Sequence, residues 1–184
     1  MTKVIISVLG KDRPGIVAAV SRVLFECDCN IENVSQTILQ TEFAGIFIAA
    51  IPAGVTPEGL REGLAARLEA FKMYVQVKPL AANGSPAPPP AAEPFVITTI
   101  GPDAKGLVAR ITAVIAGYQV NVTNLLAVFK GGNEPGDNIM IYEVDVPTDI
   151  DQQAFRRDLQ NQATALGLRL TIQHRNIFSA MNRI

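Results

Sequence analysis

The sequence predicts an α+β fold in which one small unit, with its elements in the order βαββαβ, occurs twice in tandem. Two observations support this prediction: an internal repeat that spans most of the 184 residues, and a proline-rich segment that separates the two copies. With 48% hydrophobic and 18% charged residues, the chain has enough apolar material for two small cores.

The internal repeat aligns the two halves of the chain at a constant offset. The segment that begins at Gly10 matches the segment that begins at Gly101, 91 positions later. The same offset aligns further pairs: Asp12 with Asp103, Gly15 with Gly106, Asn30 with Asn121, and Asn33 with Asn124. From Pro52 and Pro147 onward the offset is 95. We expect the four additional residues of the second copy in the turn-rich segment 130–138, because hairpin tips tolerate insertions.

Each copy is expected to contain the same six elements. In the first copy, the β-branched run at residues 4–9 predicts a strand, which is followed by a helix, strands at 30–40 and 43–51, a second helix and a strand at 73–77. Apolar residues at helical spacing are expected to face the core: Ile16, Val17, Val20, Val23 and Leu24, and then Leu60, Leu64, Leu68 and Phe71. Right-handed crossovers then give a four-stranded antiparallel sheet with both helices on one face, the ferredoxin-like arrangement.

These patterns divide the chain into four parts. We predict a first domain at residues 1–78, a linker at 79–94, a second domain at 95–174 and a C-terminal tail at 175–184. The linker contains six prolines, which favour an extended and exposed chain. The tail carries apolar residues at helical spacing that fit either packing on a core or docking to a partner protein: Ile177, Phe178, Met181 and Ile184.

Composition argues against several classes of protein. The net charge of −1 and the scattered basic residues give no reason to expect direct contact with nucleic acid. No apolar run reaches the length of about 18 residues that a membrane span needs, and the N-terminus lacks the pattern of a signal peptide. Two cysteines close in sequence, Cys27 and Cys29, favour a reducing compartment. We therefore expect a soluble cytoplasmic protein.

Candidate catalytic and metal-binding residues are few. Cys27 and Cys29 would need two further ligands to hold zinc, and His174 is the single histidine, so we interpret the cysteines as structural thiols. His174 follows a predicted strand, where a surface or capping role is expected. The sequence offers no nucleophile–base set and no phosphate-binding loop, so we predict neither an enzyme nor a cofactor.

The turn before the first helix of each copy has the composition of a ligand site. It reads GKDRPGIV in the first copy and GPDAKGLV in the second. Helix N-termini attract carboxylates, glycine allows close approach, and an aspartate pairs with an ammonium group. Together with Asn30 and Asn121, such a turn fits a free amino acid. Simpler readings stay open: Asp12 and Asp103 as plain N-caps, the glycines as packing residues, and the asparagines in positive-φ turns.

The segment GKDRPGIVAAVSRVLFECDCNIENVSQ resembles the opening of ACT domains, in which a D-R-P-G-[IL]-V turn leads into a helix and an N-I pair follows it. The tandem arrangement without an attached enzyme resembles the glycine cleavage system transcriptional repressor family. The ending IQHRNIFSAMNRI is similar to that of small stand-alone ACT proteins. In the second copy Ala104 and Lys105 replace the Arg-Pro pair, which implies unequal affinities for a ligand.

This resemblance implies that the chain senses a small amino acid, with glycine as one candidate, where ACT modules pair. The implied ligand-binding residues of the first copy are Asp12, Arg13, Pro14, Gly15, Ile16, Asn30 and Ile31. Those of the second copy are Asp103, Lys105, Gly106, Leu107, Asn121 and Val122. The resemblance also implies a homodimer that contacts a transcriptional regulator without touching DNA.

Two other functions are compatible with the sequence. The chain could be a regulatory subunit of an amino-acid or one-carbon enzyme, or a structural dimeriser that binds no ligand. An RNA-binding domain of this topology would carry aromatic residues on its sheet, where these strands carry mainly aliphatic ones.

Overall fold

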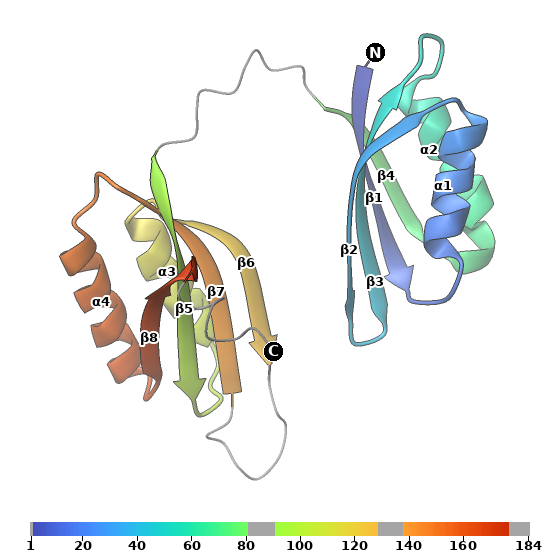
Figure 1. Cartoon of the computed structure of the whole chain (residues 1–184). Coiled ribbons are helices and arrows are strands. Elements are labelled where there is room, and N and C mark those ends of the chain that lie inside the picture. The colour runs from blue at the N-terminus through green and yellow to red at the C-terminus, as the bar shows by residue number, and fades with distance from the viewer. Residues whose placement is uncertain (1, 81–90, 129–137, 177–184) are drawn as a thin grey trace. The chain divides into compact units, whose positions relative to one another are not determined.

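The computed structural model describes residues 2–80, 91–128 and 138–176. The chain divides into two compact units, Met1–Ser85 and Pro86–Ile184 (Figure 1). Each unit has its own core.

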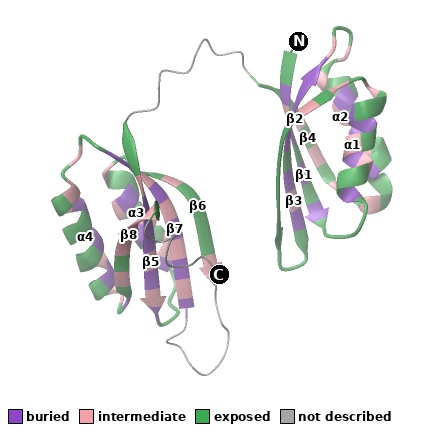
Figure 2. Cartoon of the chain, in the orientation of Figure 1, coloured by how far each residue is buried: buried purple, intermediate pink, exposed green. Residues whose placement is uncertain are grey.

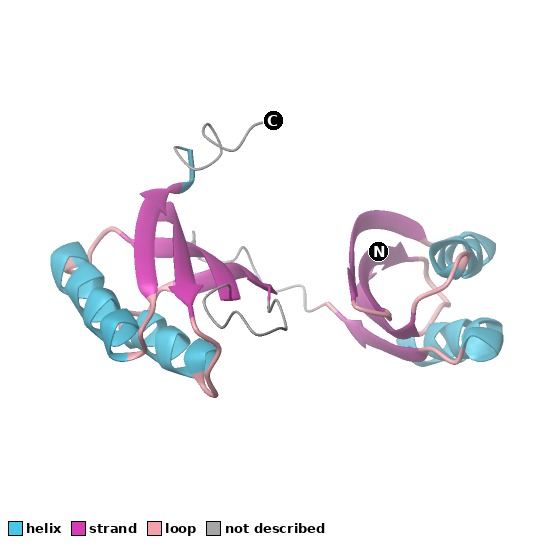
Figure 3. Ribbon diagram, turned by 90° about the horizontal axis from the view of Figure 1, so that it is seen from below, coloured by secondary structure: helices cyan, strands magenta, loops and turns pink. Residues whose placement is uncertain are grey.

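The first unit is a four-stranded antiparallel sheet in the order β2-β3-β1-β4. Its strands are β1 (Thr2–Lys11), β2 (Asn30–Leu39), β3 (Glu42–Ile51) and β4 (Tyr74–Pro79). Its helices are α1 (Ile16–Glu26), α2 (Pro57–Leu68) and the short 3₁₀ turn η1 (Glu69–Phe71). The helices cover one face of the sheet, as Figure 3 shows.

The second unit repeats this arrangement with the sheet order β6-β7-β5-β8. Its strands are β5 (Ala92–Gly101), β6 (Asn121–Val128), β7 (Asn138–Pro147) and β8 (Arg169–His174), and its helices are α3 (Leu107–Gly117) and α4 (Gln152–Ala165). The predicted fold class, two tandem ferredoxin-like units with helices on one sheet face, is confirmed.

The strand registers match the offsets of the sequence repeat. Gly10 pairs with Phe43 in the first unit, and Gly101 pairs with Asn138 in the second. The offset therefore changes from 91 to 95 between β6 and β7, as the alignment predicts. The predicted position of the insertion, residues 130–138, lies outside the described residues except for Asn138.

Alternate residues of the strands face the helices and form the first core. On β1 these are Val4, Ile6 and Val8, which meet the predicted apolar stripes of α1 and α2. Val17 is the exception, because it is 38% exposed and borders a hollow at the start of α1. The prediction that Val17 belongs to the core is therefore wrong.

Both flanking strands extend into the segment predicted as the linker. β4 ends at Pro79 and β5 begins at Ala92. Pro94 pairs with Asp145 of β7, and β8 pairs with β5 only from Phe95 onward. At Pro94 the side of β5 that faces β8 has no paired strand residue. The proline, which lacks an N–H, therefore removes no hydrogen bond between β5 and β8. Residues 81–90 of the predicted linker lie outside the described residues, as do residues 177–184 of the predicted tail.

Candidate functional site

The turn between the first strand and first helix of each unit, which we call the elbow, spans residues 12–16 in the first unit and 103–107 in the second. Each elbow contains a glycine that immediately precedes the helix. Gly15 has φ 96° and ψ −7°, and Gly106 has φ 86° and ψ 8°. This left-handed conformation costs an L-residue roughly 1–2 kcal/mol, so glycine is the residue that suits the position.

Both elbows leave the following helix without a side-chain cap. Among the described residues, no side-chain oxygen accepts a hydrogen bond from the first turn of α1 or α3. The other two helices are capped: Thr56 Oγ1 accepts from the Gly59 N–H at 3.1 Å, and Asp151 Oδ1 accepts from the Ala154 N–H at 2.9 Å. The free amide N–H groups and positive dipole ends therefore occur at the same place in both copies.

The interpretation of Asp12 and Asp103 as N-caps is wrong. The N-cap is the glycine three residues later in each elbow. The backbone N–H of Asp12 donates to Thr41 O at 2.8 Å, which ties the elbow to the β2–β3 turn. Neither carboxylate is therefore used in capping.

Each elbow borders a hollow in the surface. The first hollow has a volume of about 210 Å³ and is lined by Asp12, Arg13, Gly15, Ile16, Val17, Ala18, Gln36 and Phe43. The second has a volume of about 410 Å³ and is lined by Asp103, Ala104, Gly106, Leu107, Val108 and Ala109. The structure thus brings together most of the predicted elbow residues around each hollow; Pro14 and Lys105 belong to the elbows but are not among the lining residues.

The predicted asparagines lie at the other end of each sheet. Asn30 and Lys3 both pair with Ala50, so Asn30 is in the row of Lys3, seven residues along β1 from Gly10. At about 3.3 Å per residue, this separates Asn30 from the elbow by about 23 Å. Asn121 pairs with Asp145, and Ile31 and Val122 follow the two asparagines. Within one unit, these four residues do not meet the elbow.

The alternative reading, that the asparagines sit in positive-φ turns, is also wrong. Asn30 and Asn121 are the first residues of β2 and β6. The positive φ values after the helices belong to Asp28, at 55°, and to Gln119, at 56°.

Comparison with known families agrees with this architecture. The family model described as the ACT domain matches residues 2–78 and 93–173. The chain belongs to the ACT domain family. It is a tandem ACT-domain regulatory protein, and each unit of the structure is one ACT domain.

Relatives extend this assignment. A UPF0237 protein of Methanosarcina acetivorans is 35% identical over 91 residues, which make up 49% of this chain and 95% of that protein. The glycine cleavage system transcriptional repressor of Escherichia coli is 28% identical over 123 residues, 67% of this chain and 63% of the repressor. This chain is therefore homologous to that repressor.

Solved structures show the same fold over nearly the whole chain. An unknown protein from Galdieria sulphuraria gives a TM-score of 0.77 at 22% identity, covering 94% of this chain and 98% of its own. A structure attributed to a glycine cleavage system transcriptional repressor gives 0.63 at 18% identity, covering 94% and 96%. At these identities the likeness shows the fold alone.

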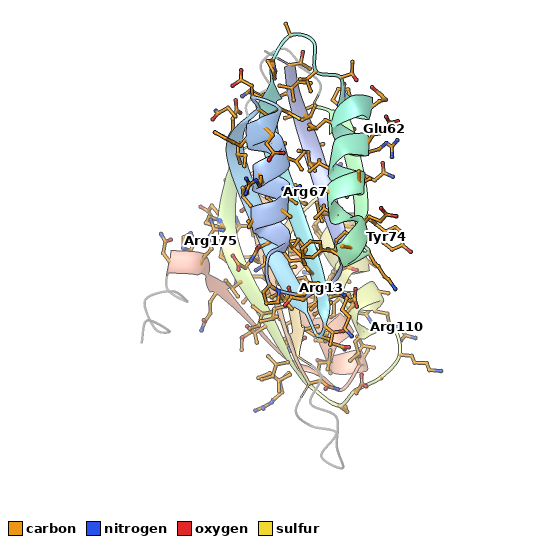
Figure 4. All side chains as sticks on the ribbon, turned by 90° about the vertical axis from the view of Figure 1, so that its right-hand side faces the viewer. Arg13, Glu62, Arg67, Tyr74, Arg110 and Arg175 are labelled. Carbon is orange, nitrogen blue, oxygen red and sulfur yellow. The ribbon has the colours of Figure 1, made fainter. Side chains whose placement is uncertain are left out.

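The two ACT domains differ in how the elbow is held. Arg13 Nη1 donates to Ala70 O of η1 at 3.4 Å, and a Cβ added at Gly15 would lie 3.7 Å from Phe71 Cζ. Figure 4 shows Arg13 in the elbow below α1. At Gly106 an added Cβ would meet nothing within 4 Å among the described residues. The first elbow is therefore braced against the end of α2, whereas the described residues show no such contact at Gly106.

The cysteines and the histidine have structural surroundings. Cys27 and Cys29 are free thiols that are half-buried against the first core. Burial raises the pKa of the Cys29 thiol, with a smaller contribution from neighbouring Cys27. His174 packs edge-on against Phe95 at 5.4 Å between ring centroids, and its Nδ1 accepts from the Asn176 N–H at 3.3 Å. Within the described ranges, no three histidine, cysteine or acidic residues are grouped as metal ligands would be.

The helices of the described segments are amphipathic or short. None of them has the combined length and apolar character that crossing a membrane requires.

Proposed function

We propose that this chain senses a small free amino acid at its elbows and acts by contact with another protein. The observation that carries the proposal is the recurrence of a helix start without a side-chain cap, beside a left-handed glycine and a hollow, in both ACT domains. The carboxylate of an amino acid would accept hydrogen bonds from the free N–H groups, and Asp12 or Asp103 would pair with its ammonium group.

The exposed edge of the sheet supports binding where two modules pair. β2 is an edge strand that is exposed along almost its whole length, as Figure 2 shows, and its Val34 and Ile38 are 45% and 52% exposed. Such an edge invites pairing with another strand. If the β2 strands of two copies of the chain pair in antiparallel fashion, Asn30 of one copy comes beside the elbow of the other. This pairing would reunite the predicted site residues, and it makes the proposed active form a homodimer.

The size of the ligand limits its affinity. Glycine has five heavy atoms, and the best small ligands gain about 1.5 kcal/mol per heavy atom. The binding free energy is then at most about 7.5 kcal/mol, which corresponds to a dissociation constant of several micromolar. Such an affinity suits the sensing of metabolite pools inside the cell, the location that this function requires.

The name of the Escherichia coli relative supports a proposal about the process that this chain regulates. We extend its role to this chain as transcriptional regulation through a protein partner, with glycine among the candidate ligands. A chain with formal net charge −1 has no electrostatic basis for strong direct binding to DNA.

Calorimetry on the full chain tests the sensing proposal. We expect at least one of glycine, serine, alanine and the branched-chain amino acids to give a saturable heat, with a dissociation constant between about 10 µM and 1 mM. If none of the twenty amino acids gives a saturable heat, the chain is better described as a structural dimeriser and the sensing proposal fails.

A further inference from the structure

The sheet presents different side chains to the two elbows. In the first ACT domain, Gln36 of β2 pairs with Gly45 of β3, which also pairs with Val8 of β1. The same row in the second domain contains Ala127, Met140 and Thr99. A glutamine–glycine pair in one domain thus corresponds to an alanine–methionine pair in the other.

This exchange changes the chemistry of the hollow. Gln36 and Phe43 line the first hollow from the sheet, whereas the described residues that line the second hollow belong to its own elbow and the first turn of α3. Gln36 is exposed, so its amide can donate and accept hydrogen bonds in the hollow. In the second domain Met140 is fully buried and Ala127 offers no polar group.

Gly45 helps to keep the space beside Gln36 open. A Cβ at position 45 would lie 2.8 Å from two ring atoms of Phe43, so a side chain is excluded from this point in the row. Phe43 is 2% exposed and forms an apolar floor. The first hollow therefore combines a charged elbow, an apolar floor and one neutral amide.

We propose that Gln36 determines the specificity of the first ACT domain, selecting an amino acid with a short, neutral, hydrogen-bonding side chain, such as serine. This inference rests on the proposed binding of an amino acid at the elbow. The hollow has a volume of about 210 Å³, which leaves room for a side chain beyond the five heavy atoms of glycine. In the second domain the position aligned with Gln36 is Ala127, so we expect the described part of this domain not to make this distinction.

The test compares L-serine with L-alanine, which differ by one hydroxyl group, in calorimetry on the full chain. We expect the wild-type chain to bind serine about fivefold more tightly than alanine, the typical worth of one neutral hydrogen bond. In Gln36→Met, which keeps the length of the side chain and removes the amide, this ratio should fall to about one while alanine binds as before.

Gln76→Met is the matched control. Gln76 is exposed on β4, where it pairs with Ser7, and its neighbours Val75 and Val77 pack against the core on the other sheet face. This variant should keep the wild-type ratio. A wild-type ratio near one, or a ratio that survives in Gln36→Met, overturns the role of Gln36 while leaving the elbow as an amino-acid site. If the chain binds neither amino acid, nor any other, the proposed function itself fails, and the inference fails with it.

Discussion

Replacing Gly101 with alanine should destabilise the second ACT domain by about 2–3 kcal/mol, the upper part of the range for overpacked interiors. A Cβ at this position would lie 2.8 Å from the carbonyl oxygen of Gly167 and 3.2 Å from Leu168 Cα. Both are backbone atoms at the turn into β8, so relief requires movement of the main chain. For a domain of this size the melting temperature should fall by about 10 °C or more.

Gly10→Ala is the matched control in the first ACT domain. There the nearest atom to an added Cβ is Met73 Sδ, at 2.8 Å, and a methionine side chain can rotate away; the nearest backbone atom, Lys72 O, lies 3.3 Å away, compared with 2.8 Å for Gly167 O at Gly101. Hydrogen–deuterium exchange with mass spectrometry separates the domains: Gly101→Ala should lower protection in β5–β8 and spare β1–β4, and Gly10→Ala should have a much smaller effect. Equal losses in the two variants would mean that the turn at Gly167 can yield, contrary to the packing described.

Replacing Asp12 with asparagine should weaken the binding of an amino acid about tenfold. Asp12 lines the first hollow and is not the cap of α1, so its carboxylate is available for an ammonium group. Asparagine keeps the shape and removes the charge, and a hydrogen bond to a charged partner contributes about 1.5 kcal/mol at the lower end of its range. Calorimetry with the best-binding amino acid measures the change.

Glu62→Gln controls for the loss of a negative charge. Glu62 lies on α2, its side chain is 72% exposed, and it is not among the residues that line the first hollow. This variant should bind like the wild type. If Asp12→Asn stays within twofold of the wild type, the ammonium group is held elsewhere, and the assignment of Asp12 is wrong.

The sequence was sufficient to predict the fold because the repeat is informative in itself. Two copies of the same apolar periodicity, separated by a proline-rich segment, leave few arrangements other than two βαββαβ units. Gly10 and Gly101 occupy equivalent positions in β1 and β5, as the alignment of the two copies predicts. Helix faces were predicted well, except for Val17, whose exposure depends on the hollow beside it.

The local chemistry of the elbows was harder to predict. An aspartate before a helix is ordinarily its N-cap, and only the backbone shows that the glycine takes this position in the left-handed conformation. Likewise, Asn30 follows the first helix in sequence, but parallel directions of β1 and β2 put it at the far end of the sheet. The sequence alone therefore indicated neither the glycine N-cap nor the distance between Asn30 and the elbow.

Gln36 and Phe43 were missed for a related reason. Both reach the first hollow because β2 and β3 end beside β1 at the elbow, and this requires the strand register. The clue in the sequence was the predicted pair of strands at 30–40 and 43–51, whose connecting turn brings residues 36 and 43 to the same end of the sheet. Without a register, neither residue stands out from the strand pattern.

In the proposed function, the uncapped starts of α1 and α3 receive the carboxylate of an amino acid. The most direct measurement is a titration of the ¹⁵N-labelled full chain with L-serine and with glycine, followed through its backbone amide resonances. We predict saturable shifts that are largest at Gly15, Ile16 and Val17, with weaker changes at Gly106 and Leu107. The opposite result would be unchanged resonances at these amides and shifts elsewhere, for example at Cys27 and Gly63 in the groove between α1 and α2. That result would contradict binding at the helix starts.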